Sequence, residues 1–200
     1  MTTRVIVVPE AIATPADVPG VHSSNDAVVI RAIAAAQGII DGPNGNLGRA
    51  IGKQTLELWL AGFPCSRRAA IYGPLNGDLS VKYLDADETE QTISSDNYRV
   101  VGNEVLFRTG FAFPEVATAP DAVRIRYGAG YNTADVPPQA KQAVIMMALH
   151  AITVGSEKAF YRSEEVEGVG KTEYTLLDQA GSNINKIVDD LLRGLRVVRI

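Results

Sequence analysis

The sequence is poor in histidine and cysteine, which build metal sites and disulfides, and it has no long apolar run. Its 200 residues include one cysteine and two histidines. The single Cys65 cannot form an internal disulfide, which suits a chain that folds in a reducing compartment. Zinc sites need several His or Cys ligands at short spacing, whereas His22 and His150 are far apart in the sequence. No apolar run reaches the ~18 residues that span a bilayer, and the first one is too short for a signal peptide.

The charge balance is equally restrictive. The net charge is -4, with 46% apolar and 21% charged residues, which is ordinary for a folded soluble chain. An acidic chain has no global attraction to nucleic acid or to an anionic membrane. Its length fits a single domain of ordinary size, and a single domain over 1–200 is predicted.

One stretch resembles the end of a nucleotide-binding loop. Residues 167–172 read EGVGKT, and a phosphate-binding loop has the pattern G-x-x-x-x-G-K-[ST]. Its first glycine is needed so that backbone amides can turn inward around a phosphate. Glu165 stands at that position, and its carboxylate would repel the phosphate. The pattern therefore does not predict an ATPase or GTPase.

Other candidate sites are also better explained as structural. Cys65 lacks a neighbouring histidine to act as its base, so a buried or inert thiol is predicted. His150 lies among apolar residues and is predicted to be a packed or interface histidine. An acidic cluster could suggest a calcium site: Asp85, Asp87, Glu88 and Glu90. It lacks the glycine of a calcium-binding loop, so a solvated hairpin tip is predicted. We therefore expect no catalytic residue, no metal and no cofactor.

Hydrophobic periodicity predicts a helix followed by an antiparallel sheet. After an extended N-terminal segment, polar residues 23–26 cap a helix with 3.6-residue periodicity that ends before the loop 41–46. From Lys53 the period changes to two, which is typical of strands. Strands are predicted within QTLELWLAGF (54–63) and at 69–72, 79–84, 90–93, 98–101, 104–108 and 122–127. Short polar turns between them, with outward tips at 76–78 and 85–88, predict a β-meander over about 53–130.

The chain then returns to helix. The run 143–154 is apolar on almost every side, which predicts a buried helix, and a last helix is predicted from Ser182. The fold class is therefore α+β: a small helical bundle (about 23–42 and 136–200) with an inserted antiparallel β-meander. We expect four residues of the central helix to pack within the subunit: Val144, Met147, Ala148 and Ile152. Other faces of the same helix are expected to lie near a neighbouring subunit.

Several stretches in one order carry a resemblance. They read DAVVIRAIAAAQGIID (26–41), GRAIGKQTLELWLAGFP (48–64), YLDADETEQTISSDNYRV (83–100), DAVRIRYGAGY (121–131), VPPQAKQAVIMMALH (136–150) and YRSEEVEGVGKTEYTLLD (161–178). Together they resemble the bacteriophage head–tail connector (adaptor, or head-completion) proteins, including versions encoded by gene transfer agents. The loop 42–46 departs from the usual lead into Gly48-Arg49, so the first helix is expected to end early.

The resemblance implies a structural virion protein without catalytic residues. It implies a homo-oligomeric ring of about twelve copies below the capsid portal, built on a heterologous interface. Its expected partners are the portal and a stopper or tail-completion protein, and DNA would pass through without sequence-specific binding. Such a protein is made in the bacterial host cytoplasm and resides in the virion, with no membrane contact. A β-rich binding or assembly module outside a virion, and an enzyme whose site forms between subunits, are the alternatives.

The C-terminus is locally basic in an acidic chain. Cations at a helix C-terminus complement the helix dipole, which accounts for one or two of its arginines. The connector family uses its C-terminal segment to engage the portal, so the resemblance implies docking there. The candidates are Arg193, Arg196, Val197, Val198, Arg199 and Ile200. Simple packing on the protein's own core is the alternative.

Overall fold

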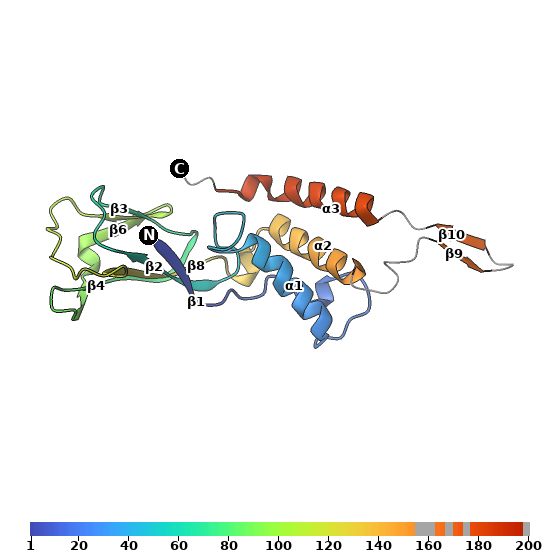
Figure 1. Ribbon diagram of the computed structural model, residues 1–200, viewed down its shortest axis with the longest axis horizontal. Coiled ribbons are helices and arrows are strands. Elements are labelled where there is room, and N and C mark those ends of the chain that lie inside the picture. Colours follow the sequence, from blue (N-terminus) through green and yellow to red (C-terminus); the bar gives the residue numbers. More distant parts are fainter. Residues whose placement is uncertain (155–162, 167–169, 174–176, 198–200) are drawn as a thin grey trace. The chain divides into compact units, whose positions relative to one another are not determined.

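A computed structural model describes residues 1–154, 163–166, 170–173 and 177–197. The chain divides into two compact units. The sheet unit comprises the described residues of 1–10, 41–136 and 197, and the helical unit those of 11–40 and 137–196 (Figure 1). None of the helices in these described ranges is long and apolar enough to cross a membrane.

The helical unit contains three α-helices: α1 (Ala27–Ile40), α2 (Pro138–Val154) and α3 (Leu177–Leu192). Helix α2 packs against both α1 and α3. A short 3-10 helix, Arg193–Leu195, follows α3, and another, Pro15–Asp17, precedes α1. Helix α1 ends at Ile40, as the loop after it predicted, whereas α3 begins earlier than the expected Ser182.

The N-terminus of α1 is fixed by Asp26. Its Oδ1 accepts hydrogen bonds from the backbone amides of Val28 (3.0 Å) and Val29 (3.2 Å). The bond from the Val29 amide is the main cause of the lowered pKa of the Asp26 carboxyl, and the bond from Val28 adds to it. A carboxylate that accepts the free amides of the first turn is a strong start signal, so the capping predicted at 23–26 resides in Asp26.

The segment between α2 and α3 contains an antiparallel hairpin. Strands β9 (Ser163–Val166) and β10 (Gly170–Glu173) pair with Lys171 opposite Glu165. Lys171 and Thr172 therefore lie in a strand. In a phosphate-binding loop these two residues begin a helix, so the local structure agrees with the rejection of that motif.

The sheet unit is built from two antiparallel sheets. The larger has the order β1 (Thr2–Val7), β2 (Gln54–Leu60), β8 (Val123–Ala129), β4 (Leu75–Leu84), β5 (Glu90–Ile93). The smaller has the order β3 (Arg68–Ala70), β7 (Glu104–Phe107), β6 (Tyr98–Val101). Fold class is therefore α+β, as predicted.

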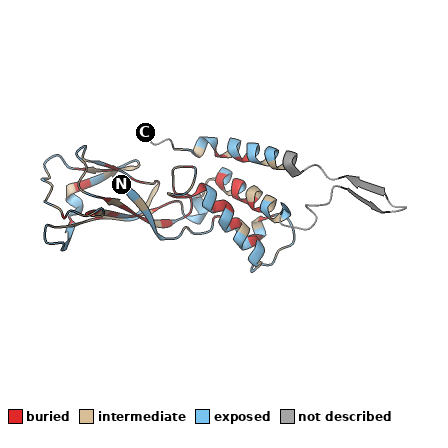
Figure 2. Cartoon of the chain, viewed as in Figure 1, coloured by how far each residue is buried: buried red, intermediate tan, exposed pale blue. Residues whose placement is uncertain are grey.

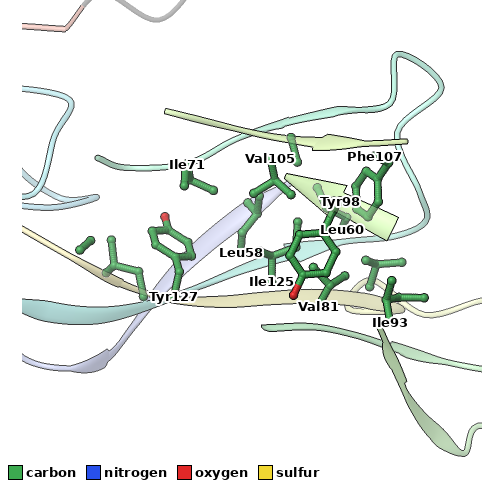
Figure 3. Close-up of a cluster of buried hydrophobic side chains, with 14 of the residues drawn as sticks. Leu58, Leu60, Ile71, Val81, Ile93, Tyr98, Val105, Phe107, Ile125 and Tyr127 are labelled. Carbon is green, nitrogen blue, oxygen red and sulfur yellow. The ribbon is translucent and has the colours of Figure 1, made fainter. Parts of the chain in front are cut away.

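The core of this unit lies between the two sheets (Figure 3). Leu58 and Val81 both pair in register with Ile125, so the three side chains form one rung of the larger sheet. Val105 and Phe107 of the smaller sheet belong to the same buried cluster. Each such side chain contributes about 1.5–3 kcal/mol when it leaves water, which explains why the apolar alternation appears so clearly in the sequence.

The strands do not form a simple meander. Strand β2 pairs with β1 and β8, and β3 pairs with β7. Only β4–β5 and β6–β7 are hairpins of consecutive strands within the sheet unit. Strand β1 also lies in a segment that was predicted merely as extended. Periodicity identifies a strand and its buried face, but pairing between distant strands is decided by the shared core.

The two expected hairpin tips have different outcomes. Residues 85–88 form the exposed β4–β5 turn, as predicted. Residues 76–78 instead lie inside β4, where the register shifts between Leu75 and Leu79. The partner strand carries Gly128 there, because a Cβ at that position would lie 2.0 Å from the carbonyl oxygen of Asn76. The Asn-Gly-Asp signal therefore marks a bulge and not a turn.

Insertions at these two places are expected to differ. Two residues, Gly-Ser, placed after Asp87 should change the free energy of unfolding by less than about 0.5 kcal/mol, since a longer surface loop costs little. The same insertion after Gly77 should lower it by about 1–3 kcal/mol, because it interrupts the β4–β8 ladder. Urea denaturation of the two variants measures the difference, and equal effects would show that 76–78 is a free loop.

Candidate interaction surfaces

Helix α1 exposes an apolar face. Val28 is 55% exposed and Ile39 is 54% exposed. Their spacing of three turns places them on one side of the helix. Ala32 and Ala35 lie between them on the same side, half-buried and exposed respectively. Figure 2 shows exposed residues along α1. We call this row the α1 outer face: Val28, Ala32, Ala35 and Ile39.

The rest of α1 is also apolar. Its inner side carries buried residues that face the core of the helical unit: Val29, Ile33, Ala36 and Ile40. Arg31 is the only charged residue among the fourteen of this helix. Helices that are apolar on all sides are normally covered on all sides. The α1 outer face is therefore a candidate contact surface.

Helix α2 is more enclosed than the sequence indicated. Val144 and Ala148 are completely buried, whereas Met147 and Ile152 are half-buried. Because α2 packs between α1 and α3, most of its apolar surface is buried inside its own unit. Contact of its other faces with a neighbouring subunit stays a prediction. Sequence reasoning predicted helix α1 but overlooked its outer face as a contact surface, although a helix with a single charged residue was a visible signal.

The C-terminal candidates are divided by the structure. Arg193 is ion-paired with Asp190 at 2.6 Å and Arg196 with Asp189 at 2.7 Å, all four side chains being largely exposed. Exposed pairs of this kind contribute about 0–1 kcal/mol, so a partner with better geometry can replace them.

Val197 is held by its own chain. Its backbone amide donates a hydrogen bond to the carbonyl oxygen of Leu47 (2.8 Å). Gly48 has a φ of +68°, and a Cβ there would lie 2.6 Å from the carbonyl oxygen of Val197. Val197 thus packs on the sheet unit, while Val198, Arg199 and Ile200 lie outside the described residues.

The loop that receives Val197 is organised by Asp41. One carboxylate oxygen accepts hydrogen bonds from the Ile51 amide (2.7 Å) and the Gln54 side chain (2.8 Å). The other accepts one from the Gly52 amide (2.8 Å). Asp41 and Gln54 are both buried. These bonds explain the role of Gln54 in the 48–64 stretch, and sequence reasoning singled out neither Asp41 nor Gln54.

The residues considered for catalysis or metal binding are separate. Cys65 is exposed, so of the two predicted alternatives the buried thiol is wrong, and an inert thiol stays a prediction. It follows Phe63-Pro64 in a loop whose side chains leave the sulfur at the surface. His150 is half-buried and lies beside Gly181 of α3. A Cβ on Gly181 would lie 3.5 Å from His150 Nε2. Nδ1 of His22 lies 3.6 Å from Oδ2 of Asp26. In the part of the chain that the structure describes, no three His, Cys, Asp or Glu residues could hold a metal ion.

Comparison with known proteins gives one consistent result. No family model and no curated protein matches the sequence. Among solved structures, a chain of the "Virion of native gene transfer agent (GTA) particle" superposes with a TM-score of 0.68 at 16% identity, over 100% of this chain and 97% of that chain. This chain has the fold of a gene transfer agent particle chain.

Two further structures agree. The "Neck of native GTA particle computed with C12 symmetry" contains a chain with a TM-score of 0.65, and the "Neck of empty GTA particle computed with C6 symmetry" one with 0.64. Both are 17% identical and cover 100% of this chain and 97% of theirs. The resemblance drawn from the sequence is thereby confirmed at the level of the fold.

Proposed function

We propose that the protein is a structural neck component of a gene transfer agent or phage particle: a head–tail connector. In this role copies form a ring that joins the capsid portal to the stopper or tail and leaves a channel for DNA. The observation that carries the proposal is full-length likeness to chains from a neck computed with C12 symmetry. A match over 100% of the chain includes both the sheet unit and the helical unit.

The α1 outer face supports the ring. A ring needs a heterologous interface, in which one patch meets a different patch of the next copy. An exposed apolar row on an otherwise packed helix is the kind of patch that such an interface covers. Symmetry of the similar necks favours a ring of about twelve copies.

The chemistry of the chain fits a passive role toward DNA. Its net charge is -4, which gives no global attraction to a polyanion in the channel. A connector needs no catalytic group, because its work is assembly. The protein would be made in the host cytoplasm and end in the virion, between portal and tail.

Loss of the gene tests this assignment. Producing cells that lack it should release DNA-filled heads without tails, and the wild-type gene supplied in trans should restore complete particles. Electron microscopy of the released particles distinguishes the two. Complete tailed particles from the deleted strain would exclude a connector and favour a binding module outside the virion.

The C-terminal residues are proposed to dock on the portal. The backbone amide of Val197 already bonds to Leu47 of the same chain. The proposed docking segment therefore consists of Arg193, Arg196 and residues 198–200. Arginine forks suit carboxylates on a partner, and Asp189 and Asp190 would be exchanged for them.

Truncation tests this docking. Deleting residues 198–200 keeps the Val197–Leu47 bond, so the chain should fold normally and bind portal-bearing capsids about tenfold more weakly or worse. Co-sedimentation with such capsids measures binding, and circular dichroism checks folding. A matched control, Lys186→Ala, removes a cation from the exposed side of α3 and should bind normally. Full binding by the truncated chain would remove residues 198–200 from the interface.

A further inference from the structure

The outer face of the smaller sheet is basic. Arg68 of β3 and Arg99 of β6 both pair in register with Leu106 of β7, so their side chains flank Leu106 on one face. Arg108 is two residues beyond Leu106, which places it on the same face by strand alternation. All three arginines are exposed. They line a groove of about 580 Å³, which we call the arginine groove: Ser66, Arg68, Arg99, Leu106, Arg108 and Thr109.

The rim of this groove is held in place. Arg67 Nη1 donates hydrogen bonds to the carbonyl oxygens of Arg108 (2.7 Å) and Phe111 (2.9 Å). The Arg67 guanidinium also lies 4.5 Å from the centre of the Phe113 ring. The loop after β7 is thus fixed before any partner arrives, which lowers the entropic cost of binding.

Three cations of the larger sheet are neutralised by carboxylates. On the outer face of the larger sheet, Arg126 pairs with the buried Glu57 and Arg124 with Asp121, both at 2.7 Å. Lys82 there bonds to Glu90, and this bond is the main cause of the lowered pKa of Glu90.

The arginine groove is neutralised only in part. Arg68 approaches Glu104 at 3.6 Å, with both side chains exposed. Among the described residues, no carboxylate lies within ion-pair distance of Arg99 or Arg108. Two arginines without an ion pair, Arg99 and Arg108, in a chain of net charge -4 suit a carboxylate-rich partner.

The same unit carries an acidic projection with free charge. In the β4–β5 turn, Asp85 turns its carboxylate inward to the amides of Asp87 and Thr89. Asp87 and Glu88 are exposed, and within the described residues their carboxylates form no ion pair. We call this turn the acidic tip: Asp85, Asp87 and Glu88. It belongs to the larger sheet, and Figure 1 shows β4 on the opposite side of this unit from β3 and β6.

We infer that the acidic tip of one copy docks in the arginine groove of the next. The tip belongs to the larger sheet and the groove to the outer face of the smaller sheet, and among the described residues no ion pair joins them within a copy. The contact is therefore assigned between copies. Such a contact is head-to-tail, the type that closes into rings. A convex hairpin carrying two unpaired carboxylates fits a concave groove with arginine forks, which bind carboxylates bidentately. The inference rests on the proposed function in assigning this contact to the ring.

Duplex DNA fits the groove less well. Phosphate-backbone binding uses a long basic stripe, whereas this patch holds three exposed arginines and includes Glu104 at its edge. The acidic tip, by contrast, is present on every neighbouring copy at the local concentration of an assembled ring.

Cross-linking from Cys65 tests the contact. Cys65 is exposed and adjoins Ser66 of the groove, so it reports on whatever docks there. The tip variant Ala86→Cys, treated with a short bismaleimide at high protein concentration, should give a ladder of linked copies on a denaturing gel. The experiment is run on the purified chain alone and on chain added to portal-bearing capsids. Asp78→Cys, an exposed acidic site elsewhere on β4, and Ala86→Cys with Cys65→Ser should give none.

Charge reversal adds the specific readout. Arg99→Glu with Arg108→Glu should reduce the ladder about tenfold, as should Asp87→Lys with Glu88→Lys, and all four substitutions together should restore it. Rings that persist in electron micrographs with no ladder, or a ladder that ignores charge, would overturn the inference and leave the proposed function intact. A ladder without rings would support the contact and count against the neck assignment. Duplex binding that is lost in the arginine variant, with no ladder, would overturn the inference in favour of phosphate recognition.

Discussion

Replacing Val28 and Ile39 with aspartate is expected to prevent ring assembly and leave the chain folded. Both side chains are more than half exposed, so the charges cost little in the isolated chain. In a ring they would be covered, and burying an unpaired carboxylate costs several kcal/mol. Since about 1.4 kcal/mol is a factor of ten in affinity, each contact between copies should weaken by at least about a thousandfold.

The comparison variant adds the same charge elsewhere. Asn183→Asp with Asn185→Asp places two carboxylates at two exposed positions of α3, and this variant should assemble like the wild type. Sedimentation and negative-stain images report assembly, while circular dichroism reports folding. Normal rings from the α1 variant would show that the α1 outer face is not an interface.

Asp41→Ala is expected to lower the free energy of unfolding by about 3–5 kcal/mol. The substitution leaves the Ile51 and Gly52 amides and the Gln54 side chain without their acceptor. Each buried donor left unsatisfied costs about 1–3 kcal/mol. For a domain of this size the melting temperature should fall by roughly 6–20 °C. Loosening of the 42–50 loop should also weaken the seat of Val197.

A close control lies in the same unit. Asp85 likewise accepts bonds from two amides, of Asp87 and Thr89, and from the side chain of Gln91. That turn is at the surface, where water replaces the lost acceptor, so Asp85→Ala should cost about 1 kcal/mol or less. Thermal denaturation of both variants measures the contrast. Comparable losses would mean that burial of Asp41 contributes nothing.

The strands could be predicted from sequence better than their pairing. Leu56, Leu58 and Leu60 alternate with partly polar residues because one face of β2 packs in the core. Nothing in that alternation indicates that β2 pairs with β1 and β8, because those strands come from distant segments. Local signals located the turn at 85–88, but Asn76-Gly77-Asp78 has turn chemistry within a bulged strand.

Helix prediction shows the same limit. Low charge indicated that the central helix is buried, yet α1 is equally poor in charged residues and its environment differs. Val144 and Ala148 are buried between two helices, and Val28 and Ile39 are not. Composition gives the amount of apolar surface, but the arrangement of elements decides which part stays exposed.

The candidate site was predictable only in part. The basic C-terminus was visible in the sequence, but its local pairing with Asp189 and Asp190 and the seat of Val197 on Leu47 depend on the fold. Asp41 was read as part of a loop, and its role appears only when the amides of Ile51 and Gly52 converge on it. The arginine groove is assembled from three strands and has no contiguous sequence signal.

Cryo-electron microscopy of purified particles from cells that produce this protein tests the central claim most directly. The account predicts that density at the neck, between portal and tail, fits both the sheet unit and the helical unit in a closed ring of about twelve copies. Particles whose neck is complete but contains no density for this chain would contradict the account.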